Sequence, residues 1–483
     1  MKWSDRQLAI FDAYENTRKN IAIEATAGSS KTTCIVECCR RTPPNKKVLF
    51  MAFNKSIAEE LRERLPSHID VNTFHSKGLR VLLSNFRIKP KINENKCFVI
   101  GKKILETKDM DVKQQIRYLF EIQIIWNYIR VNLITDYEKE IPGICIEKNI
   151  EFQERMVGDM EQIRNAWHKE MKKINSVKEI NIDFTDMLYF PYQLLDSEDF
   201  PKYDVVVTDE SQDFSTIQKE LSMRYIKKSG RFVTVGDSRQ CIYGFQGSSL
   251  EVFKSLQSYP NTIVLPLDIT YRCGKNIVEE ARKVFDNGIV AAPNAIDGVV
   301  RKGEFDEAEN GDFILCRNNL PLATVFLYLL EMRKKATIKG KEYGDALVAL
   351  VDKIKYIEDL DAMCEKKISE LKERGLTDIQ AKNNPSYVAF LEKCTILKIL
   401  YKNWGDMKKL EDNIKEIYKD DTEGIVLSTI HKSKGLEADR VFLLNRSLIP
   451  SKYANTEEAL YNEKCLLFVA ITRARKELVY CNV

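Results

Sequence analysis

A loop of small residues near the amino terminus ends in a lysine and two threonines, residue types that together could bind phosphate. It runs Ala25-Thr26-Ala27-Gly28-Ser29-Ser30-Lys31-Thr32-Thr33. The apolar run 20–23 before it predicts a buried strand, and residues 34–39 after it predict the first turns of a helix. In such a loop the amides and the helix N-terminus attract the anion, the lysine reaches the β- and γ-phosphates, and a hydroxyl binds Mg²⁺. Because Ala25 and Ser30 replace glycines of the usual pattern, the loop by itself fits an ordinary strand–helix turn equally well.

Two adjacent carboxylates, Asp209 and Glu210, follow the apolar run 204–208, which predicts a buried parallel strand. Carboxylates at such a place are costly unless a cation or hydrogen bonds offset their charge. With a phosphate loop upstream, Asp209 could hold Mg²⁺ and Glu210 could orient or deprotonate an attacking water. Gln240 follows the next predicted strand, 231–235, and could sense the γ-phosphate of a nucleotide.

Other side chains near predicted strand ends could contact nucleic acid. They are Asn54, Phe74, His75, Tyr243 and Phe245. Flat rings can stack on bases, while hydroxyls and amides can hold phosphate. For the residues after the predicted strand 68–71, the competing interpretation is an ordinary capped helix start.

The elements that would position these residues form two α/β stretches, each interrupted by a mainly helical segment. Buried strands that alternate with helices predict parallel sheets. The predicted boundaries are 1–85 and 184–260 for the first α/β domain, 86–183 for its insertion, 261–325 and 422–483 for the second domain, and 326–421 for its insertion.

Composition excludes several classes of protein. A chain of 483 residues predicts at least two domains, and a net charge of +4 is too small to indicate a polyanion partner by itself. The 12 cysteines are scattered without Cys-x-x-Cys pairs, which predicts reduced thiols rather than a metal site. No apolar run has the length of a membrane span, and the first residues lack a signal-peptide core, so we expect a cytoplasmic protein.

These motifs, in this order, resemble the UvrD/Rep-type superfamily 1 DNA helicases along nearly the whole chain. The matching positions are Gln7; 25–33; 53–55; 73–75; 209–213; 236–237, Gln240 and 242–243; Tyr271 and Arg272; Thr429, His431 and 434–437; and 469–470 with 472–474. The resemblance implies two RecA-like, P-loop NTPase domains that hold ATP and Mg²⁺ between them.

The resemblance also implies individual roles. Gln7 would contact adenine, Tyr271 would stack on it, and Glu437 would hold the ribose. Residues 25–33 would bind phosphate, with Thr32 and Asp209 on Mg²⁺ and Glu210 activating water. Three further residues would meet the γ-phosphate, namely Gln240, Arg272 and Arg473. Single-stranded DNA would contact Asn54, Phe74, His75, Tyr243, Phe245, Thr429 and His431.

Three features depart from the family's usual pattern. Ser30 stands where a glycine is usual, so its Cβ would restrict the loop, or its hydroxyl would cap the following helix. Phe245 stands where many relatives carry tryptophan. The second insertion is shorter than in the large bacterial members, which fits a compact, phage-type enzyme in a bacterial or phage-infected cytoplasm.

The expected function is that of an ATP-dependent DNA helicase or translocase that moves 3′→5′ on single strands and acts at single-strand/duplex junctions during replication or repair. The first alternative is a translocase that displaces proteins with little unwinding. The second is a nucleotide-gated DNA-binding module without turnover, for which Ser30 is the only support. The complete set of catalytic side chains argues against the second alternative.

Overall fold

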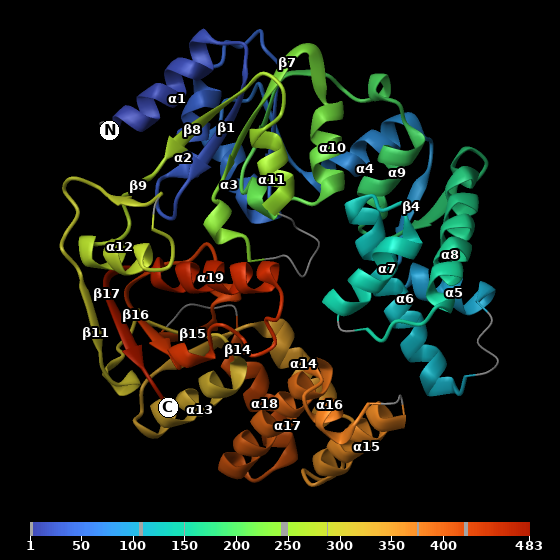
Figure 1. Ribbon diagram of the computed structural model, residues 1–483, viewed down its shortest axis with the longest axis vertical. Coiled ribbons are helices and arrows are strands. Elements are labelled where there is room, and N and C mark those ends of the chain that lie inside the picture. Colours follow the sequence, from blue (N-terminus) through green and yellow to red (C-terminus); the bar gives the residue numbers. More distant parts are fainter. Residues whose placement is uncertain are drawn as a thin grey trace. The chain divides into compact units, whose positions relative to one another are not determined.

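The computed structural model describes residues 3–105, 110–148, 150–242, 250–286, 288–373, 376–419 and 424–483. Contacts divide the chain into two compact units (Figure 1). The first comprises Met1–Thr26 and Ser30–Asp268, and the second comprises Ala27–Ser29 and Ile269–Val483. No helix within the described ranges is both long and apolar enough to cross a membrane.

A six-stranded parallel sheet forms the centre of the first unit, in the order β3-β2-β6-β7-β1-β8. Its strands are β1 (Asn20–Ala25), β2 (Val48–Ala52), β3 (Ile69–Thr73), β6 (Tyr203–Thr208), β7 (Ile226–Gly236) and β8 (Thr262–Leu267). The sequence pattern placed residues from 261 onward in the second domain, but β8 belongs to the sheet of the first unit, where Ile263 pairs with Ile21 of β1. The predicted parallel α/β fold is confirmed.

Both faces of this sheet are buried, as expected for parallel strands covered by helices. Val48 and Phe50 of β2 join a core with α1 (Asp5–Asn16), α2 (Lys31–Arg40) and α3 (Lys55–Arg64). Leu49 and Met51, on the opposite face, join a core with α4 (Phe74–Asn85), α9 (Asp186–Leu194) and α10 (Thr216–Arg224). Alternate residues of one strand therefore anchor two separate helical layers.

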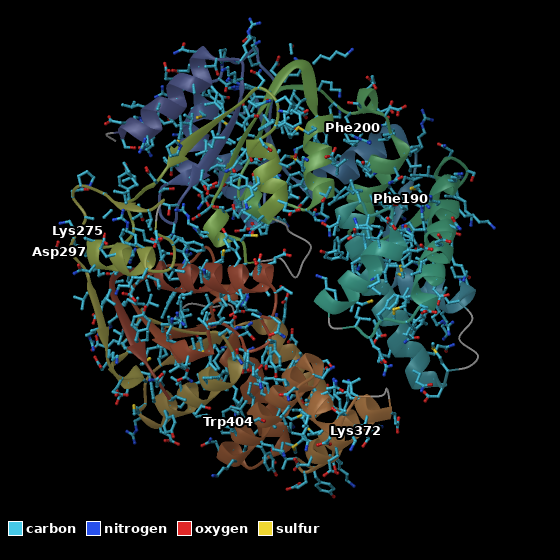
Figure 2. The ribbon with its side chains drawn as sticks, in the orientation of Figure 1. Phe190, Phe200, Lys275, Asp297, Lys372 and Trp404 are labelled. Carbon is cyan, nitrogen blue, oxygen red and sulfur yellow. The ribbon has the colours of Figure 1, made fainter. Side chains whose placement is uncertain are left out.

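The segment between α4 and α9 is mainly helical. It contains α5 (Lys96–Ile104), α6 (Val112–Asn132), α7 (Tyr137–Glu147) and α8 (Arg155–Lys172), with a parallel strand pair, β4 (Lys89–Ile92) and β5 (Glu179–Ile182). Its core is continuous with that of the sheet, and it includes Phe190 and Phe200, which Figure 2 labels. The buried guanidinium of Arg130 is compensated by Asp183 at 2.6 Å and Asp186 at 2.7 Å.

A seven-stranded parallel sheet forms the second unit, in the order β11-β17-β16-β12-β15-β13-β14. Its strands are β11 (Val299–Lys302), β12 (Phe313–Cys316), β13 (Ala336–Lys339), β14 (Tyr418–Lys419), β15 (Ile425–Thr429), β16 (Ala438–Leu444) and β17 (Ala474–Cys481). One face packs on α12 (Lys275–Arg282) and α19 (Glu457–Ile471), and the other on α13 (Asn319–Glu331).

The second insertion is smaller than the sequence predicted, because both ends of the segment 326–421 belong to the sheet domain. β13 and β14 lie in that segment yet pair with each other, and β13 also pairs with β15. The helices between them are α14 (Lys341–Val351), α15 (Asp359–Glu373), α16 (Asp378–Lys382), α17 (Pro385–Trp404) and α18 (Met407–Ile417). They share one apolar core with the sheet.

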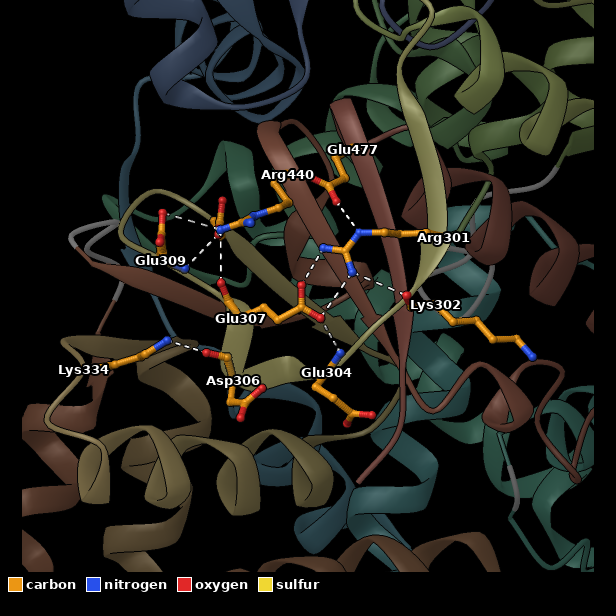
Figure 3. Close-up of polar contacts among 10 residues, drawn as sticks. Arg301, Lys302, Glu304, Asp306, Glu307, Glu309, Lys334, Arg440 and Glu477 are labelled. Carbon is orange, nitrogen blue, oxygen red and sulfur yellow. Dashed lines mark hydrogen bonds and ion pairs between the residues drawn. The ribbon is translucent and has the colours of Figure 1, made fainter.

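An ion-pair cluster fixes the edge strand β11 of the second sheet (Figure 3). Arg301 donates from Nε to Glu477 on β17 at 2.7 Å and from Nη2 to Glu307 at 2.5 Å. The hydrogen bond from Arg301, and next the one from the backbone amide of Glu304, lower the pKa of Glu307 to about 2. Arg440 on β16 bonds to Asp312 at 2.6 Å in the same layer. These ion pairs link the edge strand β11 to its neighbour β17 and to the turn that contains Glu307.

Candidate functional site

The phosphate loop lies between the end of β1 at Ala25 and the start of α2 at Lys31. Ser30, the residue before the helix, has φ 64° and ψ 39°, the left-handed conformation that glycine adopts without penalty. Its hydroxyl forms no capping hydrogen bond with the helix. Of the two outcomes expected for this serine, the structure therefore excludes the cap, and the backbone conformation explains why a glycine is usual here.

The position of Gly28, in the middle of the loop, can be occupied only by glycine. Its φ is +68°, and a Cβ built there would lie 2.4 Å from the Cβ of Arg272 and 2.7 Å from Oγ1 of Thr270. Its carbonyl oxygen accepts a hydrogen bond of 2.9 Å from the amide of Tyr271. Residues 27–29 thus pack in one unit with Arg272 and with Tyr271, a residue that is 47% exposed.

Thr32 and Asp209 are brought together as predicted metal ligands should be. The Thr32 hydroxyl donates to Oδ2 of Asp209 at 2.8 Å, and the Asp209 side chain is buried at the end of β6. Burial, and next the repulsion from Glu210, raise the pKa of Asp209 to about 6, while Thr32 and the charge of Lys31 act in the opposite direction. A hydroxyl beside a carboxylate whose charge is poorly compensated fits Mg²⁺, which prefers oxygen ligands and a few carboxylates.

Glu210 follows directly in an unusual backbone conformation, with φ 52° and ψ 41°. Its amide donates to Oδ1 of Asp209 at 2.8 Å, and its own carboxylate accepts from Nε2 of Gln212 at 2.6 Å. A non-glycine residue in the left-handed region costs free energy, and such residues cluster at functional sites. As a result the two adjacent carboxylates have different partners: that of Asp209 accepts from Thr32, and that of Glu210 accepts from Gln212.

Gln240 lies in the short turn after β7. Its Nε2 donates to Oδ2 of Asp237 at 2.6 Å, and the side chain is buried. The neighbouring Arg239 donates from Nη2 to the carbonyl of Ala25 at 2.7 Å. The predicted γ-phosphate sensor is therefore connected, through its own turn, to the first residue of the phosphate loop.

Gln7 takes part in the start of α1. Its Oε1 accepts from the amide of Ser4 at 3.0 Å, and the Ser4 hydroxyl accepts from the amide of Gln7, which together form a capping box. The amide oxygen is thus used locally, and a contact to adenine would use the nitrogen. The contact itself stays a prediction.

The second unit gathers its predicted nucleotide residues in one place. Arg272 forms an ion pair with Glu437 and donates from Nη1 to the carbonyl of Thr472 at 3.3 Å. Arg475 lies 3.6 Å from the same glutamate. Arg473 is buried and donates to the carbonyls of Val469 and Leu436, at 3.1 and 3.0 Å. The charge of Glu437, the predicted ribose contact, is therefore compensated by Arg272 and Arg475 within the protein itself.

The residues predicted to contact DNA in the first unit have different fates. Phe74 is 3% exposed, with its ring edge-on to Phe214 at a centroid distance of 4.9 Å, so the prediction that it stacks on a base is wrong. Helix α4 begins at Phe74 and turns that ring into the core, while His75 remains exposed. Asn54 caps α3 by accepting from the amide of Ile57 at 2.9 Å. Tyr243 and Phe245 lie outside the described residues.

Phe184 is a candidate that the sequence did not reveal. Its side chain is 53% exposed, and its ring lies 6.5 Å from that of His75 in an edge-to-face arrangement. It stands between two buried aspartates, Asp183 and Asp186, both of which pair with Arg130. An aromatic flanked by acidic residues was the available signal, but only the fold shows that the ring points outward.

The Thr429–His431 turn follows β15 in the second unit. Burial, and next the guanidinium of Arg317, lower the pKa of His431 to about 4. Arg317 is itself held by Glu463, with Nη2 at 2.7 Å from Oε1. His431 is therefore neutral at physiological pH and offers no positive charge to a DNA phosphate.

Comparison with known protein families agrees with this geometry. Residues 6–260 match the UvrD/REP helicase N-terminal domain, and residues 321–482 match the UvrD-like helicase C-terminal domain. The chain belongs to the UvrD/REP helicase family. The resemblance inferred from the motifs is confirmed, and the two parallel sheets are consistent with the two RecA-like domains of UvrD-like helicases.

The sequence identity to individual relatives is low, but the similarity to some of them extends over nearly the whole chain. The F-box DNA helicase protein 1 of Schizosaccharomyces pombe is 25% identical over 99% of this chain and 57% of that protein. The ATP-dependent DNA helicase Rep of Buchnera aphidicola subsp. Acyrthosiphon pisum is 22% identical over 97% of this chain and 94% of its own length. The ATP-dependent DNA helicase PcrA of Bacillus subtilis is 26% identical over 57% of this chain. The chain thus spans 57% of the fission-yeast relative but nearly all of Rep.

Proposed function

We propose that this UvrD/REP-family protein is an ATP-dependent DNA helicase or translocase. The observation that carries the proposal is the pairing of Thr32 with Asp209 at 2.8 Å, next to a strand–loop–helix phosphate site. Two of its relatives are named ATP-dependent DNA helicases, Rep and PcrA. Membership of this family implies that the protein acts on DNA and uses the free energy of ATP hydrolysis.

In the proposed site, each side chain has a chemical task. Lys31 and the amides of residues 25–33 bind the phosphates, and Thr32 and Asp209 hold Mg²⁺, which supplies charge neutralisation and Lewis acidity when bound. Glu210 accepts a proton from, or orients, the attacking water. Guanidinium groups are suited to the charge that develops on a transferring phosphoryl group, so Arg272 and Arg473 act on the γ-phosphate together with Gln240.

We further propose that adenosine recognition uses Gln7, Tyr271 and Glu437. An exposed tyrosine ring offers a face for adenine, and a carboxylate can accept hydrogen bonds from ribose hydroxyls. Single-stranded DNA and single-strand/duplex junctions are the proposed nucleic-acid ligands, with His75, Asn54 and Thr429 among the contacts. The proposed direction, 3′→5′, is typical of the family, and the proposed setting is replication or repair in a cytoplasm.

Unwinding of tailed duplexes tests the proposal and its polarity. We expect a duplex with a 3′ single-stranded tail to be separated in the presence of Mg²⁺ and ATP, and a duplex with only a 5′ tail to remain intact. Lys31→Ala should abolish the activity, and Lys283→Ala, a change at an exposed lysine of the second unit, is the matched control. Displacement of a DNA-bound protein without strand separation would favour the translocase alternative instead.

A further inference from the structure

Gln212 is a fully buried side chain in the short helical turn after Glu210, and the reaction outlined above gives it no task. The nitrogen of its side-chain amide faces hydrogen-bond acceptors, and the oxygen faces a hydrogen-bond donor. Nε2 donates to Oε2 of Glu210 at 2.6 Å and lies 3.2 Å from Oδ2 of Asp213. Oε1 accepts from the backbone amide of Asp237 at 3.0 Å. The orientation of the amide is therefore set by its partners, since the nitrogen must face the carboxylates and the oxygen must face the N–H.

The second anchor of this side chain is the turn that follows β7. A Cβ built on Gly236 would lie 2.9 Å from Oε1 of Gln212, so only glycine allows the amide to approach this closely. The backbone carbonyl of Gln212 also accepts from Sγ of Cys241 at 3.4 Å. In the same turn Asp237 holds Arg239 at 3.0 Å and Gln240 at 2.6 Å. Gln212 is thus fixed at both ends before it reaches Glu210.

We infer that Gln212 is a positioning residue, which holds the carboxylate of Glu210 in the orientation needed to activate water and ties that orientation to the turn 236–241. The inference rests on the proposed role of Glu210. A glutamate side chain has several rotatable bonds, and general-base catalysis depends on the placement of the accepting oxygen. The hydrogen bond of 2.6 Å from Nε2 of Gln212 restrains Oε2 of Glu210, and because the donor is neutral it leaves the negative charge of the carboxylate in place.

Gln212→Met tests this inference, because methionine fills a similar volume and removes the hydrogen bonds of both side-chain amide atoms. We expect kcat for ATP hydrolysis, measured with saturating single-stranded oligo(dT), to fall at least tenfold. We expect KM for ATP to stay within about twofold, because the side chain acts on the hydrolytic step and not on nucleotide binding. Gln162→Leu is the matched control, since Gln162 also donates to a carboxylate, that of Asp159, but on a helix of the insertion.

A double-mutant cycle with Glu210→Gln separates positioning from a general structural role. If Gln212 acts through Glu210, Gln212→Met should change the residual rate of the Glu210→Gln protein by less than about twofold. An equal fold-loss in both backgrounds would overturn the inference. If Gln212→Met fails to fold, Gln212→Asn takes its place, because it keeps an amide but withdraws it by one methylene from Glu210, and the same cycle applies.

The outcomes distinguish this inference from the function on which it rests. If Glu210→Gln leaves kcat unchanged, the proposed role of Glu210 is wrong, and the inference falls with it. If Glu210→Gln lowers kcat while Gln212→Met leaves it within twofold of the unsubstituted protein, the inference alone is refuted.

Discussion

The left-handed conformation of Ser30 gives a sharp prediction about Ser30→Gly. A non-glycine residue in this region costs about 1–2 kcal/mol. Glycine avoids that cost but loses about 0.5–1 kcal/mol through the greater entropy of the unfolded chain. Since the serine hydroxyl forms no cap that would be lost, the two effects differ by about 0–1.5 kcal/mol in favour of glycine, and we expect a stabilisation near the middle of that range, about 0.7 kcal/mol.

Urea unfolding of the purified chain measures this difference. We expect the transition midpoint of Ser30→Gly to rise, with the slope unchanged, because the same surface is exposed on unfolding. Ser30→Ala is the control. It keeps the Cβ in the strained conformation and removes only the hydroxyl, so its midpoint should match that of the original protein within error.

Two results would refute the reasoning. A lower midpoint for Ser30→Gly would show that the loop is not strained at this residue. A loss of about 1 kcal/mol in Ser30→Ala would show that the hydroxyl does cap α2, a contribution of the size expected for an N-cap.

The environments of His431, Asp209, Phe184 and Phe74 give four further predictions. For His431, whose pKa falls from 6.5 to about 4 on folding, the unfolded chain binds the proton more readily. The free energy of unfolding contributed by this residue should therefore be complete above pH 6.5 and be lost by about 2–3 kcal/mol as the pH falls to 4. His431→Asn should flatten that part of a stability–pH curve, and an unchanged curve would contradict the burial argument. The pKa of Asp209 is raised to about 6, so protons should compete with the metal for this carboxylate. The Mg²⁺ concentration that half-activates the ATPase should therefore rise about tenfold per pH unit below 6. If that concentration does not change between pH 5 and 6, Asp209 is not a metal ligand. For the aromatic residues, Phe184→Ala should weaken binding of single-stranded DNA by about 1–3 kcal/mol, as measured by fluorescence anisotropy, with melting temperature preserved. Phe74→Ala should instead cost about 3–5 kcal/mol of stability through a core cavity, and the opposite pattern would reverse these assignments.

Local chemistry in the sequence was enough to place the residues proposed to bind nucleotide at strand ends. Thr32 and Asp209 are 177 residues apart, yet the strand–loop–helix pattern and the carboxylates after β6 predicted their meeting. The same patterns could not say which sheet a strand joins. β8 is an apolar run like any other, and its place beside β1 depends on pairing between residues far apart in the chain.

Side-chain direction was the other quantity that local patterns missed. Ser30 precedes a helix, as a capping serine does, but the loop forces a backbone conformation in which the hydroxyl makes no cap. Phe74 follows a strand, as a ligand-contacting residue does, but it opens a helix whose first turn faces the core. Phe184 is exposed although Asp183 and Asp186 are buried against Arg130, and its backbone amide donates to Glu94 at 2.9 Å, a residue 90 positions away in the chain.

The most direct test of the central claim is the rate of ATP hydrolysis with and without single-stranded DNA, in the unsubstituted protein and in Lys31→Ala and Glu210→Gln. Glu220→Gln, a change at a partly exposed glutamate on α10, is the matched control. The account predicts strong stimulation by DNA that Lys31→Ala and Glu210→Gln abolish and Glu220→Gln preserves. Nucleotide binding without DNA-stimulated turnover in the unsubstituted protein would contradict it and would favour a nucleotide-gated DNA-binding module.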